Sequence, residues 1–287
     1  MEQATFENSS CQILDGKLLS QHFVQQAKML VSQKKIVPKL AVILVGENPA
    51  SQVYVNNKIK LFREAGFESQ SYFYKGNEIS EQALIECIEA LNHDEGVHGI
   101  LIQLPLPAHF NQDKILSAIS AKKDVDGFLA QNIGALACGH FSQAIACTPF
   151  GVMALLYSYG IPVEGRHAVV VGRSNIVGKP MGLLLLGANA TVTFAHSKTS
   201  NLKEICQSAD ILIAAAGKPE LITKDFVKPG CVVVDVGIHK KSDGKLCGDV
   251  HQNAREVASA MSPVPGGVGP MTIAMLMVNT SLAAWNT

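Results

Sequence analysis

The stretch His167-Ala-Val-Val-Val-Gly-Arg-Ser-Asn-Ile-Val-Gly-Lys-Pro180 is the clearest indication of a fold in this chain. It opens with a valine run, which is typical of a strand buried on both faces of a parallel sheet. The run breaks at Gly172, and an apolar helical pattern follows Gly178. A strand, a glycine turn and a helix N-terminus place backbone N–H groups against a phosphate. The stretch therefore predicts a Rossmann-like dinucleotide-binding unit.

The glycine spacing departs from two common phosphate-binding motifs. Ser174 stands where the G-x-G-x-x-G fingerprint has its middle glycine. A P-loop needs four residues between its glycines and Ser or Thr after the lysine, whereas Pro180 follows Lys179 here. Pro180 suits the first turn of a helix. An ordinary strand–turn–helix crossover remains open on this stretch alone.

The next strand pattern, Ala190–Ala195, bears on which dinucleotide binds. NAD sites usually end this strand with an acid that accepts a hydrogen bond from the ribose 2′-OH. Here the strand is followed by His196-Ser-Lys-Thr199, which contains no acid. Hydroxyls and a cation fit a 2′-phosphate, and Arg173 can add a bidentate contact. The sequence favours NADP over NAD.

Composition limits the class of protein. The 287 residues suffice for two domains, and 24 basic residues balance 24 acidic ones, so we expect no nucleic-acid or anionic-membrane partner. No apolar run approaches the ~18 residues of a membrane span, and the N-terminus does not resemble a secretory signal. Seven cysteines without a C-x-x-C pair favour a cytoplasmic protein with neither disulfides nor a zinc site.

Strand and helix patterns alternate along the chain. The first half has helical patterns at 17–35, 51–65 and 80–91 and strand patterns at 39–45, 67–74 and 97–104. The second half has further strand patterns at 190–195, 211–215 and 232–236 and a final amphipathic helix at 271–285. This order predicts an α/β fold with parallel sheets. We expect a domain of residues 1–147, a dinucleotide-binding domain of residues 148–269, and a segment 270–287 that packs back on the first.

Polar residues gather at the carboxyl edge of the first predicted sheet. Tyr54 and Lys58 share one helix face, Gln103 ends an apolar strand, and Asp124 and Asp126 lie in a polar loop. Each has a simpler interpretation: a solvated lysine beside a half-buried tyrosine, an amide that satisfies a backbone group, and aspartates in Asx turns. Their agreement at one edge favours a ligand site.

Five segments of the chain resemble, in order, the motifs of one enzyme family, the bifunctional methylenetetrahydrofolate dehydrogenase/cyclohydrolases, called FolD in bacteria. They run over nearly the whole chain. The segments are Ala50-Ser-Gln-Val-Tyr-Val-Asn-Asn-Lys-Ile-Lys60, Gln103-Leu-Pro-Leu-Pro107, Lys123-Asp-Val-Asp-Gly127, Val171-Gly-Arg-Ser-Asn-Ile-Val-Gly-Lys-Pro180 and Pro263-Val-Pro-Gly-Gly-Val-Gly-Pro-Met-Thr272.

The resemblance implies two reactions on a folate substrate. NADP⁺ oxidises 5,10-methylenetetrahydrofolate to the 5,10-methenyl cation, and water then opens the cation to 10-formyltetrahydrofolate. It also implies two α/β domains flanking a cleft, the second of them Rossmann-like, and a homodimer without a metal.

Site residues follow from the same resemblance. Lys58 corresponds to the catalytic lysine, Gln103 to its hydrogen-bond partner, Tyr54 to a residue stacked near the folate, and Asp126 to the carboxylate that holds the pterin ring. The folate site further includes Ile102, Leu104, Pro270, Met271 and Thr272, and the NADP contacts are Gly172, Arg173, Ser174, Ser197 and Ile238.

The two reactions make different demands on the protein. Hydride loss needs the nicotinamide held close and in line but no general base. Hydrolysis needs proton transfer, which a lysine performs only when its pKa is lowered by burial and by the cationic substrate. A neutral glutamine suits such a lysine better than a carboxylate. Two alternatives remain, another two-domain NADP-dependent dehydrogenase of the shikimate type and a non-catalytic NADP-binding module.

Overall fold

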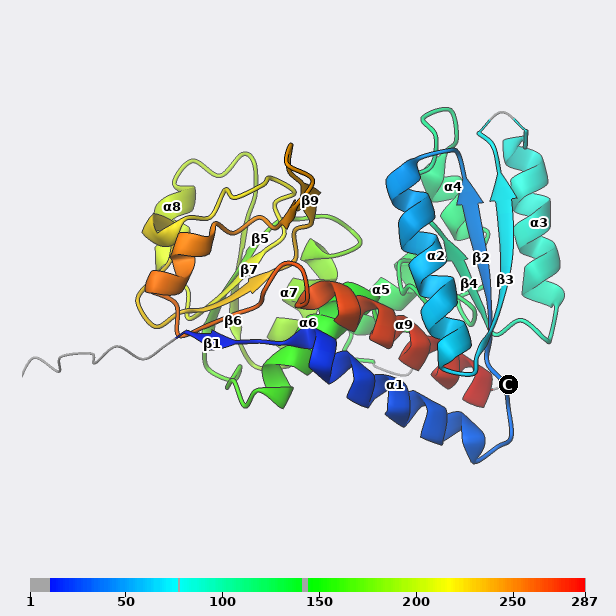
Figure 1. Cartoon of the computed structure of the whole chain (residues 1–287), viewed down its shortest axis with the longest axis horizontal. Coiled ribbons are helices and arrows are strands. Elements are labelled where there is room, and N and C mark those ends of the chain that lie inside the picture. Colours follow the sequence, from blue (N-terminus) through cyan, green and yellow to red (C-terminus); the bar gives the residue numbers. More distant parts are fainter. Residues whose placement is uncertain (1–10, 77, 141–143, 287) are drawn as a thin grey trace, which may run out of the picture. The chain divides into compact units, whose positions relative to one another are not determined.

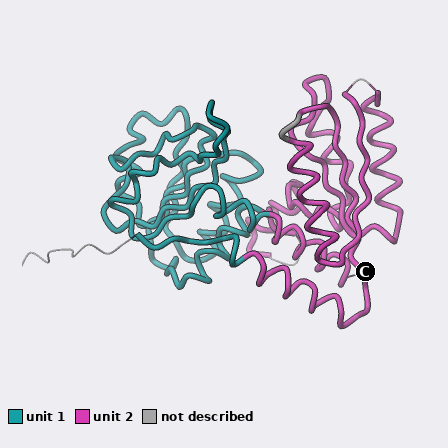
Figure 2. The backbone as a smooth tube through the Cα atoms, viewed as in Figure 1, with its two compact units in different colours: residues 1–19, 148–272 teal, residues 20–147, 273–287 magenta. Residues whose placement is uncertain are grey.

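A computed structural model describes residues 11–76, 78–140 and 144–286. The chain divides into two compact units (Figure 2). The first consists of residues 1–19 and 148–272, and the second of residues 20–147 and 273–287. We call them the large-sheet unit and the small-sheet unit.

The small-sheet unit contains a parallel sheet in the order β3-β2-β4 (Figure 1). Its strands are β2 (Lys39–Val45), β3 (Glu68–Tyr74) and β4 (Gly99–Ile102). Its helices include α2 (Pro49–Glu64), α3 (Glu81–His93), α4 (Gln112–Ser117) and α5 (Ala130–Ala137), and most of α1 (Gly16–Ser32). The predicted β-α-β-α-β order is confirmed, whereas α5 was not predicted.

Both faces of strand β2 are buried, as the continuous apolar run predicts. Ala41, Ile43 and Val45 point to one face and join a core with Leu84 and Ile88 of α3. The alternate residues of β2 are buried on the other face, and helix α2 packs on β2 and β3. The chain leaves α2 through Gly66, whose φ of +79° confirms it as the C-terminal cap.

The large-sheet unit contains a sheet in the order β1-β11-β8-β7-β5-β6, parallel throughout. The strands are β1 (Gln12–Ile13), β5 (His167–Val171), β6 (Thr191–Ala195), β7 (Ile211–Ala214), β8 (Val232–Asp235) and β11 (Ala260–Met261). The other elements are α6 (Cys147–Ser158), α7 (Gly178–Gly187), α8 (Leu202–Gln207), two 3-10 helices (Lys224–Phe226 and Gln252–Glu256) and a hairpin of β9 (His239–Lys240) and β10 (Leu246–Cys247).

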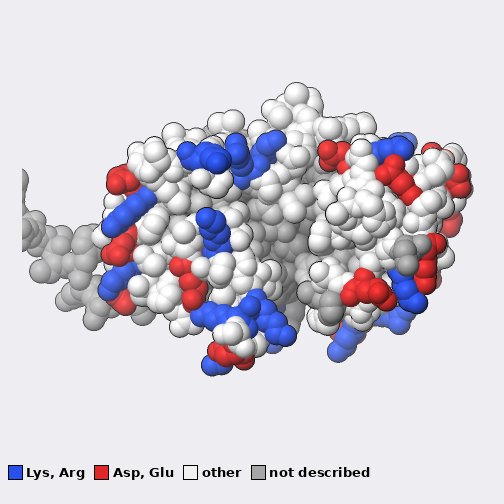
Figure 3. Space-filling model, turned by 90° about the horizontal axis from the view of Figure 1, so that it is seen from above, with Lys and Arg blue, Asp and Glu red and all other residues white. Residues whose placement is uncertain are grey.

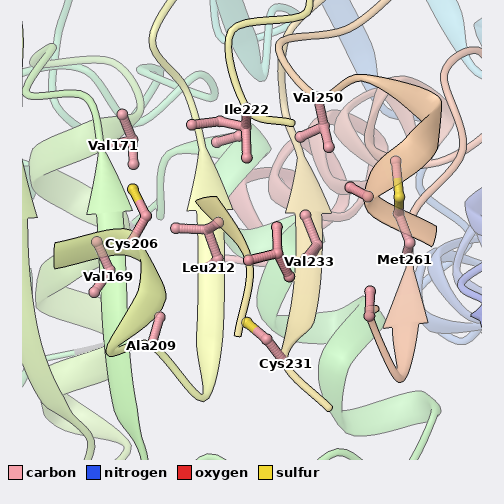
Figure 4. Packing of buried hydrophobic residues seen from close by; sticks show 14 of the residues in the cluster. Val169, Val171, Cys206, Ala209, Leu212, Ile222, Cys231, Val233, Val250 and Met261 are labelled. Carbon is pink, nitrogen blue, oxygen red and sulfur yellow. The ribbon is translucent and has the colours of Figure 1, made fainter. Parts of the chain in front are cut away.

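The core of the large-sheet unit explains its valine-rich strands. Val169, Leu212 and Val233 lie on the same face of neighbouring strands, and Figure 4 shows them side by side with Cys206 and Met261. Strand β5 has β6 on one side and β7 on the other. The strand order therefore reverses at β5, and this switch point is where doubly wound sheets bind ligands at their carboxyl edge. The predicted α/β class with a Rossmann-like unit is confirmed.

The N-terminal segment differs from the predicted 1–147 domain. Strand β1 pairs with β11, and the main-chain N–H of Leu14 donates to the carbonyl of Met261 at 3.0 Å. The main-chain N–H of Asp15 donates to the Tyr159 hydroxyl at 2.8 Å. These contacts attach the start of the described chain to the large-sheet unit. The residues Ile13-Leu-Asp-Gly16 predict a short strand and turn, and β1 confirms that strand at Gln12–Ile13. The sequence does not show with which sheet so short a strand pairs.

Helix α9 (Val268–Trp285) differs from the sequence analysis in two respects, its amphipathic pattern and the length of its apolar segment. Ile273–Met277 are all buried, and five consecutive helical positions go right around the axis, so the predicted amphipathic pattern is wrong. Among the described residues, α9 is also the one helix long and apolar enough, by length and composition, to cross a membrane. Because 56% of it is buried within the protein, it has the properties of a core helix.

Candidate active site

Tyr54, Lys58 and Gln103 meet at one side of helix α2. The Lys58 Nζ lies 4.5 Å from the centre of the Tyr54 ring, and it donates to Gln103 Oε1 at 3.4 Å. Lys58 is only 5% exposed, so the interpretation as a solvated lysine is wrong. Gln103 follows β4, where its main-chain N–H donates to Ile43, and its amide Nε2 donates to the Leu104 carbonyl at 2.7 Å. The remaining amide oxygen therefore faces the amine.

Asp126 adds a carboxylate whose charge acts on Lys58. Its side chain is half-buried in the loop before α5, and burial raises its pKa to about 6 although the Lys58 charge opposes that shift. Burial lowers the pKa of Lys58, and the Asp126 charge opposes that shift in turn. Burial also raises the pKa of Tyr54, so its hydroxyl stays protonated at neutral pH. Burial therefore favours the neutral form of the Lys58 amine, while the Tyr54 hydroxyl keeps its proton.

Asp124 has a different role from Asp126. Its carboxylate accepts hydrogen bonds from the main-chain N–H groups of Gly127 and Leu129, at 3.1 and 2.9 Å, and from Asn132 Nδ2 at 2.7 Å. Burial raises the pKa of Asp124 although these donors oppose the shift. The interpretation as a turn-forming aspartate is thus confirmed for Asp124. Its hydrogen bonds fold the loop that carries Asp126.

We expect Asp124→Ala to lower the free energy of unfolding by about 2–4 kcal/mol, because it leaves three donors without their charged acceptor. The measurement is urea denaturation. Glu89→Ala, on the exposed side of α3, is the control and should change stability by less than about 0.5 kcal/mol. Equal stabilities of the two variants would show that Asp124 does not hold the loop.

Two residues of this site escaped the sequence analysis. Asn279 of α9 is 3% exposed and donates through Nδ2 to the carbonyls of Val125 and Ile145, both at 2.8 Å. It thereby joins the segments that carry Asp126 and Cys147. The Cys147 thiol donates to the Val125 carbonyl at 3.2 Å, and burial raises the pKa of this thiol. The one signal in the sequence is a polar Asn within an apolar helix.

The glycine turn after β5 is tightly packed, as a dinucleotide cradle requires. A Cβ on Gly172, whose φ is +147°, would lie 2.3 Å from the Ala215 carbonyl oxygen. A Cβ on Gly178 would lie 2.4 Å from the Gly172 carbonyl oxygen. Only glycine lets β5, the loop after β7 and the start of α7 approach this closely. These residues fit NADP at the switch point of the sheet.

The other predicted NADP contacts lie around this turn and at neighbouring strand ends. Arg173 and Ser197 are exposed, and Ile238 is 61% exposed, so their side chains are free to meet a ligand. The Ser174 hydroxyl accepts from the main-chain N–H groups of Val177 and Gly178, at 3.2 and 3.3 Å. Ser174 therefore shapes the turn, and its contact with NADP stays a prediction.

The predicted folate residues are divided between the units. Ile102 and Leu104 flank Gln103 in the small-sheet unit, and Ile102 is only 2% exposed. Pro270, Met271 and Thr272 lie in the first turns of α9, in the large-sheet unit. Met271 is fully buried and lies close to Gly151, and the Thr272 hydroxyl lies 3.0 Å from that of Thr148. Their place in a folate site stays a prediction.

Two family models match the chain. The model described as the catalytic domain of tetrahydrofolate dehydrogenase/cyclohydrolase matches residues 14–126, and the model of its NAD(P)-binding domain matches residues 146–287. A relative from Streptococcus agalactiae, named bifunctional protein FolD, is 52% identical over 278 residues. The match covers 95% of this chain and 97% of the relative.

Solved structures are similar over the same length. FolD of Campylobacter jejuni has a TM-score of 0.94 and 48% identity, covering 96% of this chain and 99% of that one. FolD of Trypanosoma brucei, solved with NADP and an inhibitor, has a TM-score of 0.90 and 35% identity, covering 96% and 97%. Shikimate 5-dehydrogenase of Thermus thermophilus, at 15% identity and a TM-score of 0.52, shares the fold alone. The resemblance seen in the five motifs is therefore confirmed, and the chain belongs to the tetrahydrofolate dehydrogenase/cyclohydrolase family.

Proposed function

We propose that Lys58 is the acid–base residue of a bifunctional enzyme that oxidises 5,10-methylenetetrahydrofolate with NADP⁺ and hydrolyses the methenyl product to 10-formyltetrahydrofolate. The observation that carries this role is the burial of Lys58 against a neutral amide, with a lowered pKa. A lysine that is partly neutral can accept a proton from the attacking water and return it to the leaving nitrogen. A carboxylate in place of Gln103 would keep the amine charged.

The other residues bind and orient the folate. Asp126 accepts the N–H donors on the edge of the pterin, and Tyr54 offers its ring as a stacking surface. NADP supplies the hydride acceptor of the first reaction. In that step the protein holds the methylene carbon of the folate in line with the nicotinamide, and the hydride transfer itself requires no proton transfer.

An assay of methenyltetrahydrofolate absorbance tests the function. The enzyme should form the methenyl compound from 5,10-methylenetetrahydrofolate and NADP⁺ and then consume it. Another two-domain NADP-dependent dehydrogenase would form none, and a non-catalytic module would bind NADP without turnover.

Arg173 is the residue we expect to distinguish NADP⁺ from NAD⁺. Arg173→Ala should weaken NADP⁺ binding by about 1–3 kcal/mol, the size of a lost charge-assisted hydrogen bond, and change NAD⁺ binding little. Calorimetric titration with each cofactor measures this. Arg166→Ala, an exposed arginine just before the opposite end of β5, is the matched control. Equal losses for both cofactors would show that Arg173 does not bind the 2′-phosphate.

We further propose a cytoplasmic homodimer that acts on small molecules. Strand β6 is an outer strand of its sheet, and the exposed side chains of Phe194 (44%) and Leu186 (60%) lie on it and on α7. The outer edge of such a strand, with apolar side chains beside it, is a favourable surface for a second copy. Light scattering tests the assembly. On the face drawn in Figure 3, Lys and Arg side chains are interspersed with Asp and Glu, which does not favour a nucleic-acid partner.

A further inference from the structure

Asp235, Asp249 and His239 form a connected cluster at the carboxyl edge of the large sheet. We propose that these three residues, the loop clamp, position the loops that follow β7 and β8 for NADP binding. They are positioning residues for the dehydrogenase and take no part in the hydrolysis. The inference rests on the proposed function only in naming NADP as the ligand of this edge.

Asp235 anchors the clamp at the end of β8. It is 2% exposed, and its carboxylate accepts from the main-chain N–H groups of Gly237, Asp249 and Val250, at 3.0, 2.9 and 2.9 Å. The fit is tight, since a Cβ on Gly248 would collide with the carboxylate. The carboxylate therefore joins the turn after β8 to the segment after β10.

Asp249 connects two further loops through one side chain. It is completely buried, and its Oδ2 accepts from the main-chain N–H of Gly217 at 2.9 Å. Its Oδ1 lies 2.7 Å from Nε2 of His239. In the tautomer that carries its proton on this nitrogen, the ring donates to the carboxylate. Gly217 belongs to the loop after β7, whereas His239 directly follows the turn after β8.

The position of these loops makes the clamp relevant to the cofactor. The loop after β7 also contains Ala215, whose carbonyl packs against Gly172 in the glycine turn. The turn after β8 carries Ile238, which is exposed. Both loops thus leave strands at the edge where doubly wound sheets bind ligands. Movement of Gly217 or His239 would displace the surface on which the dinucleotide rests.

A metal site is not the better explanation for this cluster. Among the described residues, no group of three His, Cys, Asp or Glu side chains could hold a metal ion. The acceptor positions of Asp249 are instead occupied by N–H donors from two loops. The clamp also lies entirely within the large-sheet unit, whereas Lys58 and Gln103 belong to the other unit. A substitution in the loop clamp should therefore weaken NADP binding and leave the cyclohydrolase rate unchanged.

The test compares His239→Ala with His239→Gln, which keeps an N–H donor. His239→Ala should raise the NADP⁺ Kd about tenfold, the scale of one lost hydrogen bond to a charged group, and speed amide exchange of Gly217 in the free protein by a similar factor. His239→Gln should stay within about threefold of the parent in both measurements. Calorimetry and hydrogen exchange measure these without turnover. Lys240→Ala, the exposed next residue of β9, is the control and should change neither.

The cyclohydrolase rate on the same proteins separates positioning from general damage. It should stay at the parent value in both His239 variants. An unchanged Kd and unchanged Gly217 exchange in His239→Ala would overturn the inference, and so would an equal loss of cyclohydrolase activity. If the parent binds NADP⁺ but turns over no folate, the proposed function fails, while the Kd and exchange results still decide the role of the clamp.

Discussion

Lys58→Gln should lower the cyclohydrolase rate about 10²-fold or more, the usual scale for losing acid–base catalysis, while the dehydrogenase rate falls much less. The reason is the difference between the two reactions. Hydrolysis needs a group that both accepts and returns a proton, and hydride transfer needs none. Gln103 does not titrate, and burial raises the pKa of Tyr54 further from neutrality. Glutamine at position 58 keeps a polar chain but removes the titrating amine, so methenyltetrahydrofolate should accumulate.

The two rates are measured on the same purified variant, with circular dichroism to verify folding. Lys60→Gln is the matched control, because Lys60 lies on the same helix with its side chain 72% exposed and paired with Glu64 at 3.7 Å. It should leave both rates unchanged. A folded Lys58→Gln protein that hydrolyses the methenyl compound at the parent rate would remove Lys58 from the mechanism. Equal, severe loss of both rates would mean that the lysine mainly positions the substrate.

Elements with two buried faces were the easiest to predict from the sequence. Strand β2 occupies residues 39–45, as predicted, because burial on both sides gives a continuous apolar run. Strand β4 (Gly99–Ile102) is shorter than the predicted 97–104, although the main-chain N–H groups of His98 and Gln103 on either side of it also donate to β2. Strands β9, β10 and β11 have two residues each, too few to show a period. Strand β1 is as short, and the sequence predicts a strand there but not its partner β11.

The meeting of Lys58 with Gln103 follows from topology. In a parallel sheet the carboxyl ends of all strands lie at one edge, so a polar residue ending β4 must lie near the helix that follows β2. The different roles of Asp124, which folds the loop, and Asp126, which is proposed to bind folate, cannot be predicted from topology. They depend on which carboxylate meets the N–H groups of Gly127 and Leu129, and two positions of one short loop look equivalent in sequence. The hydrogen bond from Asn279 to the Val125 carbonyl is still harder to predict, since 154 residues separate the two in the sequence.

Asp126→Ala should raise the KM for folate about 10²-fold in both reactions, since one carboxylate that accepts two N–H donors supplies about 3 kcal/mol. The NADP⁺ Kd should stay normal, because Asp126 belongs to the small-sheet unit and the glycine turn to the large-sheet unit. Steady-state kinetics with varied folate, together with calorimetry for NADP⁺, measure both. Damage from Asp124→Ala at folate binding, with Asp126→Ala harmless, would mean that the wrong aspartate was chosen.

Asp126→Asn adds a test of the coupling between the two titrating groups, since it removes the charge and keeps the shape. The Asp126 carboxylate favours the charged form of Lys58 and so opposes the lowering of its pKa by burial. Removing that charge should lower the pKa of Lys58 further. Because hydrolysis needs the neutral amine, the rise of the cyclohydrolase kcat with pH should move to lower pH in Asp126→Asn at saturating folate. A shift to higher pH, or none, would show that the Asp126 charge does not act on the amine during turnover.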